Sequence, residues 1–342
     1  LNKGEYPVRE AAAWTIVKIG DQSCIPALAN LLKSDDNQVV LLAQDALIAF
    51  NGDIDAAVAK AIPAAGNAGK IAGLQLLAMR NATANINTVL EQTKSESPEV
   101  VAAAYVALKD VVSDRDLTNL CGMLETADAL AIPPLQRAVI SALSFLPKNE
   151  QASTITRRMI QAGDNKKSLY YVVLASTGQP EALATIVKGF RTSTGAQRDA
   201  AFEALLNWKG IEAADELFNI CKENTSSNYF NPALNAYIKL VSNPAITGEN
   251  RLLKLRKAME IAKTDQQKIE ILKQIEKTGT FLGMLYAGEF LNQKSVQQAA
   301  ANAVMNIALG NKDYTGTNVR DLLNKVIPVS YTHLRAHETD SY

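Results

Sequence analysis

The chain has 342 residues, 47% of them hydrophobic and 6% aromatic, and its 35 basic residues balance 35 acidic ones. A formal charge of zero excludes the overall basic field on which nucleic-acid binding usually depends. Three cysteines spaced about a hundred residues apart exclude a disulfide framework. No apolar run in the sequence reaches the roughly 20 residues of a membrane span, and no signal peptide is visible.

The segment Pro7–Lys33 has the pattern of two helices joined by a tight turn. The apolar residues of the first helix follow one stripe, Val8, Ala12, Ile16 and Ile19, widened by Ala11 and Trp14. Those of the second helix keep helical spacing too, at Ile25, Leu28, Leu31 and Leu32. Between them we expect Gly20 to adopt a left-handed backbone and either Asp21 or Ser23 to cap the second helix. Neither helix can bury its apolar face alone, so the pattern predicts further copies of the unit.

The same plan recurs along the chain. Gly52 and Asp53 stand in the second unit where Gly20 and Asp21 stand in the first, an offset of 32 residues. Later units begin near Lys70, Ser97, Leu135, Ser168, Ala196, Asn224, Asp265 and Ser295. An insertion at Thr126–Pro134 predicts a longer loop before the fifth unit. The fold class that follows is all-α, a right-handed α-solenoid of about ten two-helix repeats, since strand signals are absent from the sequence.

The run VREAAAWTIVKIGD, followed by IPALANLL, resembles the short HEAT repeat of bacterial and phycobilin-lyase-like (PBS-lyase-like) proteins. Arg9, Arg137 and Arg198 match the arginine of that repeat, and Asp21 and Asp53 match its turn aspartate. The resemblance implies that these residues tie neighbouring units together. The expected structural signature is therefore Arg9, Gly20, Asp21, Gly52, Asp53, Arg137 and Arg198.

We expect residues 1–328 to form one HEAT-like solenoid, a fragment of a larger chain because no initiating methionine is present. Val329–Thr339 resembles the translated read-through of a sequencing-library adapter, so we expect residues 329–342 to be non-native and disordered. Both histidines, His333 and His337, lie in this tail, and we do not interpret their i, i+4 spacing as a metal site. Without a native histidine or a phosphate-binding loop, the sequence predicts no catalytic residue, cofactor or metal.

Two groups of residues are candidates for partner binding. Basic side chains crowd one predicted helix near residue 251, and with a second basic group near residue 157 they could line a strip for an anionic partner. Aromatic residues at the start of the eighth unit could contact a peptide or glycan. The candidates are Arg157, Arg158, Arg251, Lys254, Arg256, Lys257, Tyr229 and Phe230. The alternatives are a solvated helix face for the basic group and core packing for the aromatic one.

These features predict a non-enzymatic scaffold that binds a protein partner on the concave face, formed by the second helices of the units. Similar HEAT-like arrays precede a 3-keto-disaccharide (glycoside) hydrolase domain in large secreted bacterial proteins. That resemblance implies an alternative, in which a catalytic domain and any carbohydrate contact lie outside these residues. Nucleic-acid binding is a further alternative that the neutral charge disfavours. The expected location is periplasmic or secreted under the hydrolase alternative and cytoplasmic otherwise.

Overall fold

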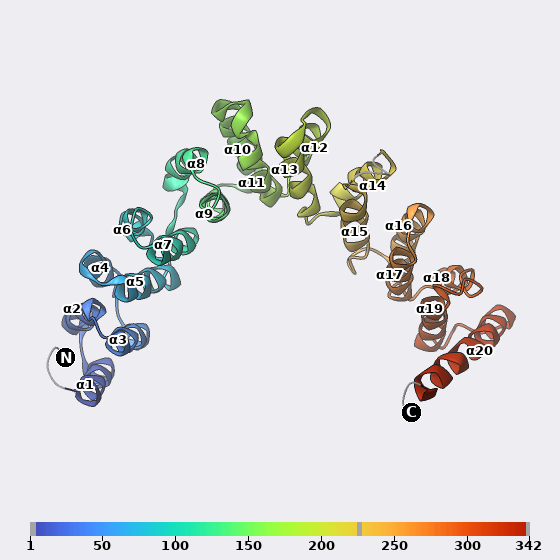
Figure 1. The fold of residues 1–342 in the computed structure, drawn as a ribbon, viewed down its shortest axis with the longest axis horizontal. Helices are drawn as coiled ribbons and strands as arrows, with labels where there is room; N and C mark the ends of the chain where they lie inside the picture. Colours follow the sequence, from blue (N-terminus) through green and yellow to red (C-terminus); the bar gives the residue numbers. More distant parts are fainter. Residues whose placement is uncertain (1–4, 224–227, 340–342) are drawn as a thin grey trace. The chain divides into compact units, whose positions relative to one another are not determined.

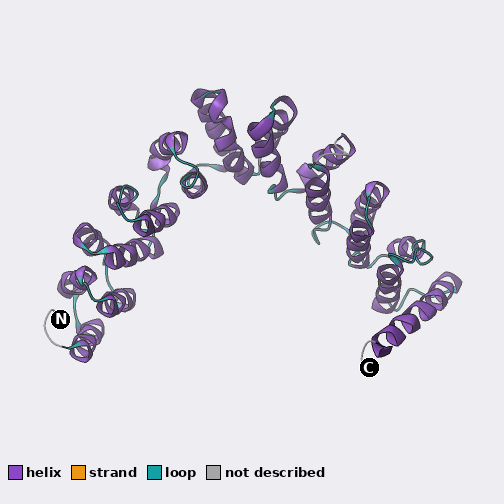
Figure 2. Ribbon diagram, viewed as in Figure 1, coloured by secondary structure: helices purple, strands orange, loops and turns teal. Residues whose placement is uncertain are grey.

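The computed structural model describes residues 5–223 and 228–339, with side chains described as far as Val329. The described residues form twenty α-helices and no strand, joined by short loops and 3-10 turns (Figure 2). The all-α prediction is therefore confirmed. The chain divides into two compact units, Leu1–Ala201 (unit 1) and Phe202–Tyr342 (unit 2). Each unit is a stack of helix pairs, the arrangement of an α-solenoid, whereas the handedness stays a prediction.

Unit 1 has two layers of helices (Figure 1). In the layer of first helices, α1 packs against α3, α3 against α5, α5 against α7, α7 against α9 and α9 against α11. Their bounds are α1 Tyr6–Ile19, α3 Asn37–Ala49, α5 Asn67–Met79, α7 Pro98–Val111, α9 Ile132–Ser144 and α11 Tyr171–Thr177. The layer of second helices contains α2 Ile25–Asn30, α4 Asp55–Ala61, α6 Ile86–Gln92, α8 Leu117–Thr126, α10 Lys148–Ala162 and α12 Pro180–Thr192.

Unit 2 repeats the plan, and helix α13, Gly195–Leu206, contains the boundary between the units. Its other helices are α14 Ala214–Glu223, α15 Phe230–Val241, α16 Gly248–Ile261, α17 Asp265–Glu276, α18 Phe281–Gly288, α19 Gln297–Gly310 and α20 Thr317–Thr339. Helix α17 packs against α19, while α14 packs against α16 and α16 against α18. Within residues 5–223 and 228–339 the helices form ten pairs, in agreement with the prediction of about ten repeats.

Local sequence signals account for many helix ends. The Asp21 carboxylate accepts the Ser23 amide at 2.9 Å and caps the 3-10 turn that opens the second helix of the first pair. This hydrogen bonding, first from the Ser23 hydroxyl and then from its amide, lowers the pKa of Asp21. Ser97 accepts the Val100 amide at 3.4 Å and caps α7, whose first residue is Pro98.

Polar side chains one repeat apart in sequence connect neighbouring pairs. The side-chain amide of Gln22 donates a hydrogen bond from Nε2 to the backbone carbonyl of Asp53 at 2.7 Å, across 31 residues. Gln44 bonds Gln75 at 2.7 Å with the same separation. Further along, Asn306 donates to Glu276 at 2.8 Å, across 30 residues. These separations match the repeat length, so the same positions of successive copies lie next to each other.

Helix α1 differs from its predicted pattern. The second helix buries Ile25, Leu28, Leu31 and Leu32 as expected, but Val8 and Ile19 of α1 are exposed and Ala13 is its buried residue. The reason is that α1 packs against α3 on one side, and its opposite side has no neighbouring helix among the described residues. Gly20 is not left-handed either, because its φ is −74°. A Cβ there would lie 2.5 Å from the Ile16 carbonyl oxygen, so close approach explains the glycine.

The segment before the fifth pair is shorter than predicted. Helix α8 ends at Thr126 and α9 begins at Ile132, so Pro133 and Pro134 lie within a helix and not in the loop. Proline is tolerated there because amides in a first helical turn have no intrahelical partner. At the other end, α20 extends to Thr339, and the disorder expected for residues 329–342 stays a prediction. The adapter origin of the tail stays a prediction, and the side chains of its histidines lie outside the described residues.

None of the helices within residues 5–223 and 228–339 combines the length and the apolar character that a membrane span requires.

Candidate partner-binding groove

An apolar groove of about 550 Å³ lies between α7 and α9 in unit 1. One wall comes from α7, with Pro98, Val101, Tyr105 and Val106. The other comes from the loop after α8 and the first turns of α9, with Leu130, Ala131, Pro133 and Pro134. Tyr105 is half-buried in the groove, and this burial, followed by the negative charge of Asp128, raises the pKa of its hydroxyl. The tyrosine is therefore neutral at physiological pH.

Asp128 holds the loop that forms one edge of the groove. Its carboxylate Oδ1 accepts the Leu130 amide at 3.0 Å and the Ala131 amide at 2.9 Å. Its carbonyl oxygen accepts the amides of Ala131 and Ile132, both at 3.2 Å. These bonds fix the backbone on both sides of Leu130, whose side chain is 90% exposed. The loop therefore presents a large apolar side chain to solvent in a defined position.

Charged groups stand at the rim of the groove. Glu96 precedes the first turn of α7, and Arg137 lies in the second turn of α9; both are exposed. Among the described residues neither of them forms an ion pair. The groove thus has an apolar interior and charges of both signs at its rim, a common arrangement in protein-binding sites.

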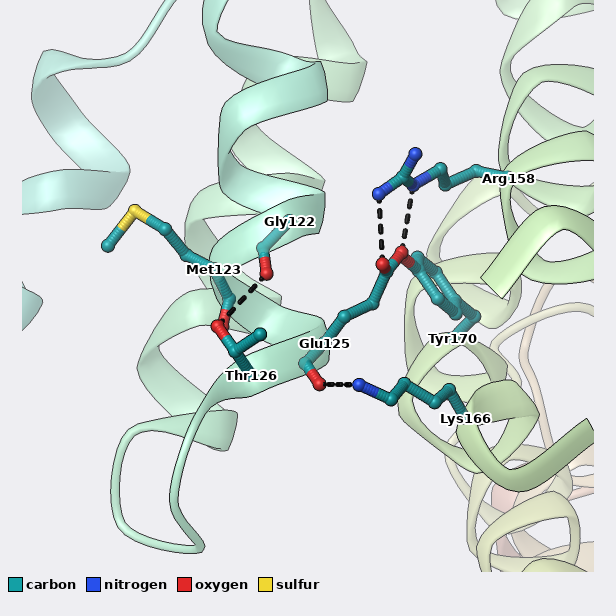
Figure 3. A network of polar contacts seen from close by, with 7 residues as sticks. All are labelled: Gly122, Met123, Glu125, Thr126, Arg158, Lys166 and Tyr170. Atoms are coloured by element: carbon teal, nitrogen blue, oxygen red, sulfur yellow. Dashed lines mark hydrogen bonds and ion pairs between the residues drawn. The ribbon is translucent and has the colours of Figure 1, made fainter. Parts of the chain in front are cut away.

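A polar cluster anchors the end of α8 from which this loop departs (Figure 3). Arg158 of α10 forms an ion pair with Glu125, with Nε 2.8 Å from Oε1, and donates a hydrogen bond from Nη2 to Oε2 at 2.9 Å. The buried Tyr170 hydroxyl donates to the same carboxylate, and Lys166 donates to the Glu125 carbonyl. Burial and the hydrogen bond to Glu125 raise the pKa of Tyr170. Glu125 therefore joins the fourth, fifth and sixth repeats of unit 1.

Comparison with known families identifies one of the repeats. Residues 8–34 match the family model described as PBS lyase HEAT-like repeat. The match covers this one repeat of the chain. The matched residues span most of α1, the turn capped by Asp21 and the whole of α2, so the resemblance that the sequence motif indicated is confirmed there.

Two of the matching solved structures are engineered proteins. Two crystal structures from the Northeast Structural Genomics Consortium, each described as an engineered protein, cover 94% and 84% of this chain and 98% and 97% of their own chains. They are 13% and 16% identical to it, with TM-scores of 0.34 and 0.21. No curated protein matches the sequence.

The HEAT-like signature residues have different environments. The Asp53 carboxylate accepts a hydrogen bond from the Asp55 backbone amide at 3.1 Å. The Asp53 backbone carbonyl accepts the hydrogen bond from the Gln22 side chain of the preceding repeat. The Gly52 carbonyl oxygen accepts a hydrogen bond from the Arg80 guanidinium at 3.1 Å. The Arg198 guanidinium lies 4.5 Å from the centroid of the Phe190 ring. Arg9 is half-buried in α1. Arg137 differs from the expected inter-repeat contact, because its side chain is exposed at the groove.

The predicted basic residues of unit 1 are not equivalent. Arg157 is exposed on α10, but its neighbour Arg158 is bound to Glu125. A side chain held by an ion pair within the fold has less freedom to bind an external anion. The expected role of Arg158 in partner binding is therefore replaced by a structural one in this arrangement.

The predicted basic helix of unit 2 is α16, and two of its basic residues contact other helices. Lys254 lies 3.7 Å from Asp215 of α14, and the Arg256 guanidinium lies 4.9 Å from the Tyr286 ring centroid. Arg251 is half-buried, while Lys257 is exposed. Because the two basic groups belong to different units, a continuous basic strip stays a prediction.

The aromatic residues at the start of the eighth repeat are mainly structural. Phe230 is 3% exposed, and Lys263 Nζ lies 3.7 Å from its ring centroid. The predicted partner contact through Phe230 is therefore wrong, because its ring is enclosed when α15 packs against α14. Tyr229 is half-buried and its ring meets Phe202 edge-on, with centroids 4.8 Å apart. The core-packing alternative describes this pair better.

Sequence reasoning missed the groove residues Tyr105, Val106 and Leu130. The signal that could have found them was the apolar run ALAIPP, where Leu130 follows an aspartate that can cap a turn. A second difference concerns the binding face. The groove lies on the layer of first helices, whereas the repeat pattern predicted binding on the layer of second helices.

Proposed function

We propose that this helical repeat scaffold binds a protein partner through the groove between α7 and α9. The observation that carries the proposal is the 90% exposed Leu130, held at the edge of an apolar groove by the bonds to Asp128. Burial of exposed apolar surface by a partner stabilises the complex by about 25 cal/mol per Å². A fixed backbone adds to this gain because less loop entropy is lost on binding.

Photo-crosslinking tests whether the groove meets a partner. A photoreactive residue replaces Ala102, which is exposed in the groove, and a matched control replaces Ala56, which is exposed on α4. We expect position 102 to crosslink a defined protein that position 56 does not. The purified partner should then bind the unlabelled chain.

The affinity for that partner provides the decisive measurement. Leu130→Glu should raise the Kd at least about tenfold, because a charge replaces a side chain that becomes buried in the complex. Leu309→Glu is the control, since Leu309 of α19 is 73% exposed and belongs to unit 2. Equal affinities for the Leu130 and Leu309 variants would remove the groove as the binding site.

The chemistry of the groove supports binding and not catalysis. Its titratable residues are the neutral Tyr105 and the three charged groups at the rim, Glu96, Asp128 and Arg137. The hydrolase-associated and nucleic-acid alternatives stay predictions, and neither is favoured by a contact in this region.

A further inference from the structure

We infer that the segment bound in this groove is an amphipathic α-helix of the partner, acidic toward its N-terminus and basic toward its C-terminus. The inference rests on the proposed function and specifies the class of its ligand. It further assigns a direction: the bound helix lies antiparallel to α7. Three properties of the groove lead to this assignment, namely its backbone, its length and the positions of its charges.

The first property is that the groove walls offer few free backbone amides to an extended peptide. Beyond their first turns, the amides of α7 and α9 are paired along each helix. In the first turns Pro98, Pro133 and Pro134 have no amide hydrogen, and the amides of Val100 and Ile132 are bound to Ser97 and Asp128. The amides of Leu130 and Ala131 in the intervening loop are already bound to Asp128. An extended peptide buried here would leave its own amides and carbonyls without partners, which costs free energy. A helix satisfies these groups internally and offers only side chains to the groove.

The second property is length. From Pro98 to Val106 the wall on α7 covers nine residues, a length of about 12 Å at a rise of 1.5 Å between successive residues. Two turns of helix are about 11 Å long and place apolar side chains at positions i and i+4 on one face. The cavity volume of about 550 Å³ between this wall and Leu130 is the space into which those side chains would insert.

The third property is charge. Both acidic residues of the rim precede a first helix: Glu96 lies two residues before α7, and Asp128 lies four residues before α9. Arg137 lies five residues into α9, about 8 Å further along the helix axis. A partner helix therefore gains complementary charges when its basic residues lie over the N-terminal ends of α7 and α9 and its acidic residues lie near Arg137.

The direction follows from the stability of the partner helix itself. Acidic residues in a first turn and basic residues in a last turn stabilise a helix through its macrodipole. A helix with this charge order meets both ends of the groove rim only when it runs antiparallel to α7. A helix with the opposite charge order, basic first and acidic last, is destabilised by its own macrodipole. If it ran antiparallel to α7, its charges would also be repelled by those of the rim.

A displayed library of 14-residue peptides tests the inference and does not require the natural partner to be identified. The library is selected on the full chain and depleted on the Leu130→Glu variant, so that the retained peptides depend on the groove. We expect the retained peptides to share two aliphatic residues four positions apart, acidic residues before them and basic residues after them. Circular dichroism should show helix formation, and fluorescence anisotropy gives the Kd of each labelled peptide.

Charge reversal in the protein then tests the direction. Arg137→Glu should weaken the selected peptides about three- to tenfold, the effect of one partly desolvated ion pair and its replacement by repulsion. The same substitution should tighten peptides in which the acidic residues have been changed to lysine. Arg115→Glu is the matched control, because Arg115 is exposed in unit 1 outside the groove, and it should change neither affinity.

Each failure has a separate meaning. Groove-dependent peptides that contain proline within the apolar stretch, or that place basic residues before acidic ones, would overturn the helix assignment while the groove remained a binding site. A selection that yields no peptide sensitive to Leu130→Glu would also overturn it. The proposed function is then judged independently, by the crosslinking of the natural partner at position 102.

Discussion

Replacing Glu125 by alanine should loosen the region where three repeats of unit 1 meet. The substitution removes the acceptor of the Tyr170 hydroxyl and the ion-pair partner of Arg158. Tyr170 is fully buried, so its hydroxyl would be left without an acceptor. Lys166 bonds the backbone carbonyl at this position and keeps that contact. The loss is therefore confined to two side-chain interactions.

The size of the effect follows from the burial of these groups. A buried hydroxyl that loses its acceptor costs about 1–3 kcal/mol. The side chains of Arg158 and Glu125 are 30% and 15% exposed, so their pair is worth about 1–2 kcal/mol, between the values for surface and buried pairs. Glu125→Ala should then lower the local free energy of unfolding by about 2–5 kcal/mol. Tyr170→Phe alone should cost about 1 kcal/mol, because the hydroxyl and its bond disappear together.

Hydrogen exchange is the appropriate assay, because repeat arrays open in segments and a single midpoint does not report one repeat. Faster exchange is expected in α8, in α10 and in the turn that contains Tyr170. Glu91→Ala serves as the control, since Glu91 is exposed on α6. Exchange in α2 should be unchanged by every variant.

The double variant provides the sharpest test. Adding Tyr170→Phe to Glu125→Ala removes the orphaned hydroxyl, so it should cost nothing further or restore about 1 kcal/mol. Costs that add to within about 0.3 kcal/mol would show that the two side chains do not interact. A Glu125→Ala variant as stable as Glu91→Ala would refute the role of this cluster.

Three further outcomes are expected. Leu28→Ala should lower the free energy of unfolding by about 2–5 kcal/mol and Ile19→Ala by less than about 0.5, measured by urea titration, because the first is buried and the second is exposed; equal costs would contradict this. Native Cys221, whose pKa burial raises to about 12, should resist iodoacetamide at pH 8 while the half-buried Cys24 reacts, and both should react in urea. The pKa of Asp21 is lower when folded than the unfolded value of 3.8, so its cap contributes stability above that pH and loses it as the pH falls through the folded value. The protection of the α2 amides, taken relative to the intrinsic exchange rate at each pH, should therefore fall in acid for the natural chain but not for Asp21→Asn.

Local patterns predicted the repeat plan well. The positions of Ile25, Leu28 and Leu32 were enough to predict a buried second helix, because helical periodicity depends on neighbours three and four residues away. The caps at Asp21 and Ser97 were predictable for the same reason. The predictions failed where a second segment decides the outcome, as in α1, where Val8 and Ile19 remain exposed.

The sequence by itself determined the class of fold, the approximate number of helix pairs and the resemblance of the first repeat to the HEAT-like family, because these depend on contacts within about 30 residues. Only the tertiary structure decided which polar residues connect repeats and which face a partner. Arg137 and Arg158 look alike in sequence, yet one stands at the rim of the groove and the other binds Glu125, 33 residues away. The groove itself depends on how Asp128 fixes Leu130 beside α7. Side chains from separate repeats meet there, and no local pattern encodes their distance.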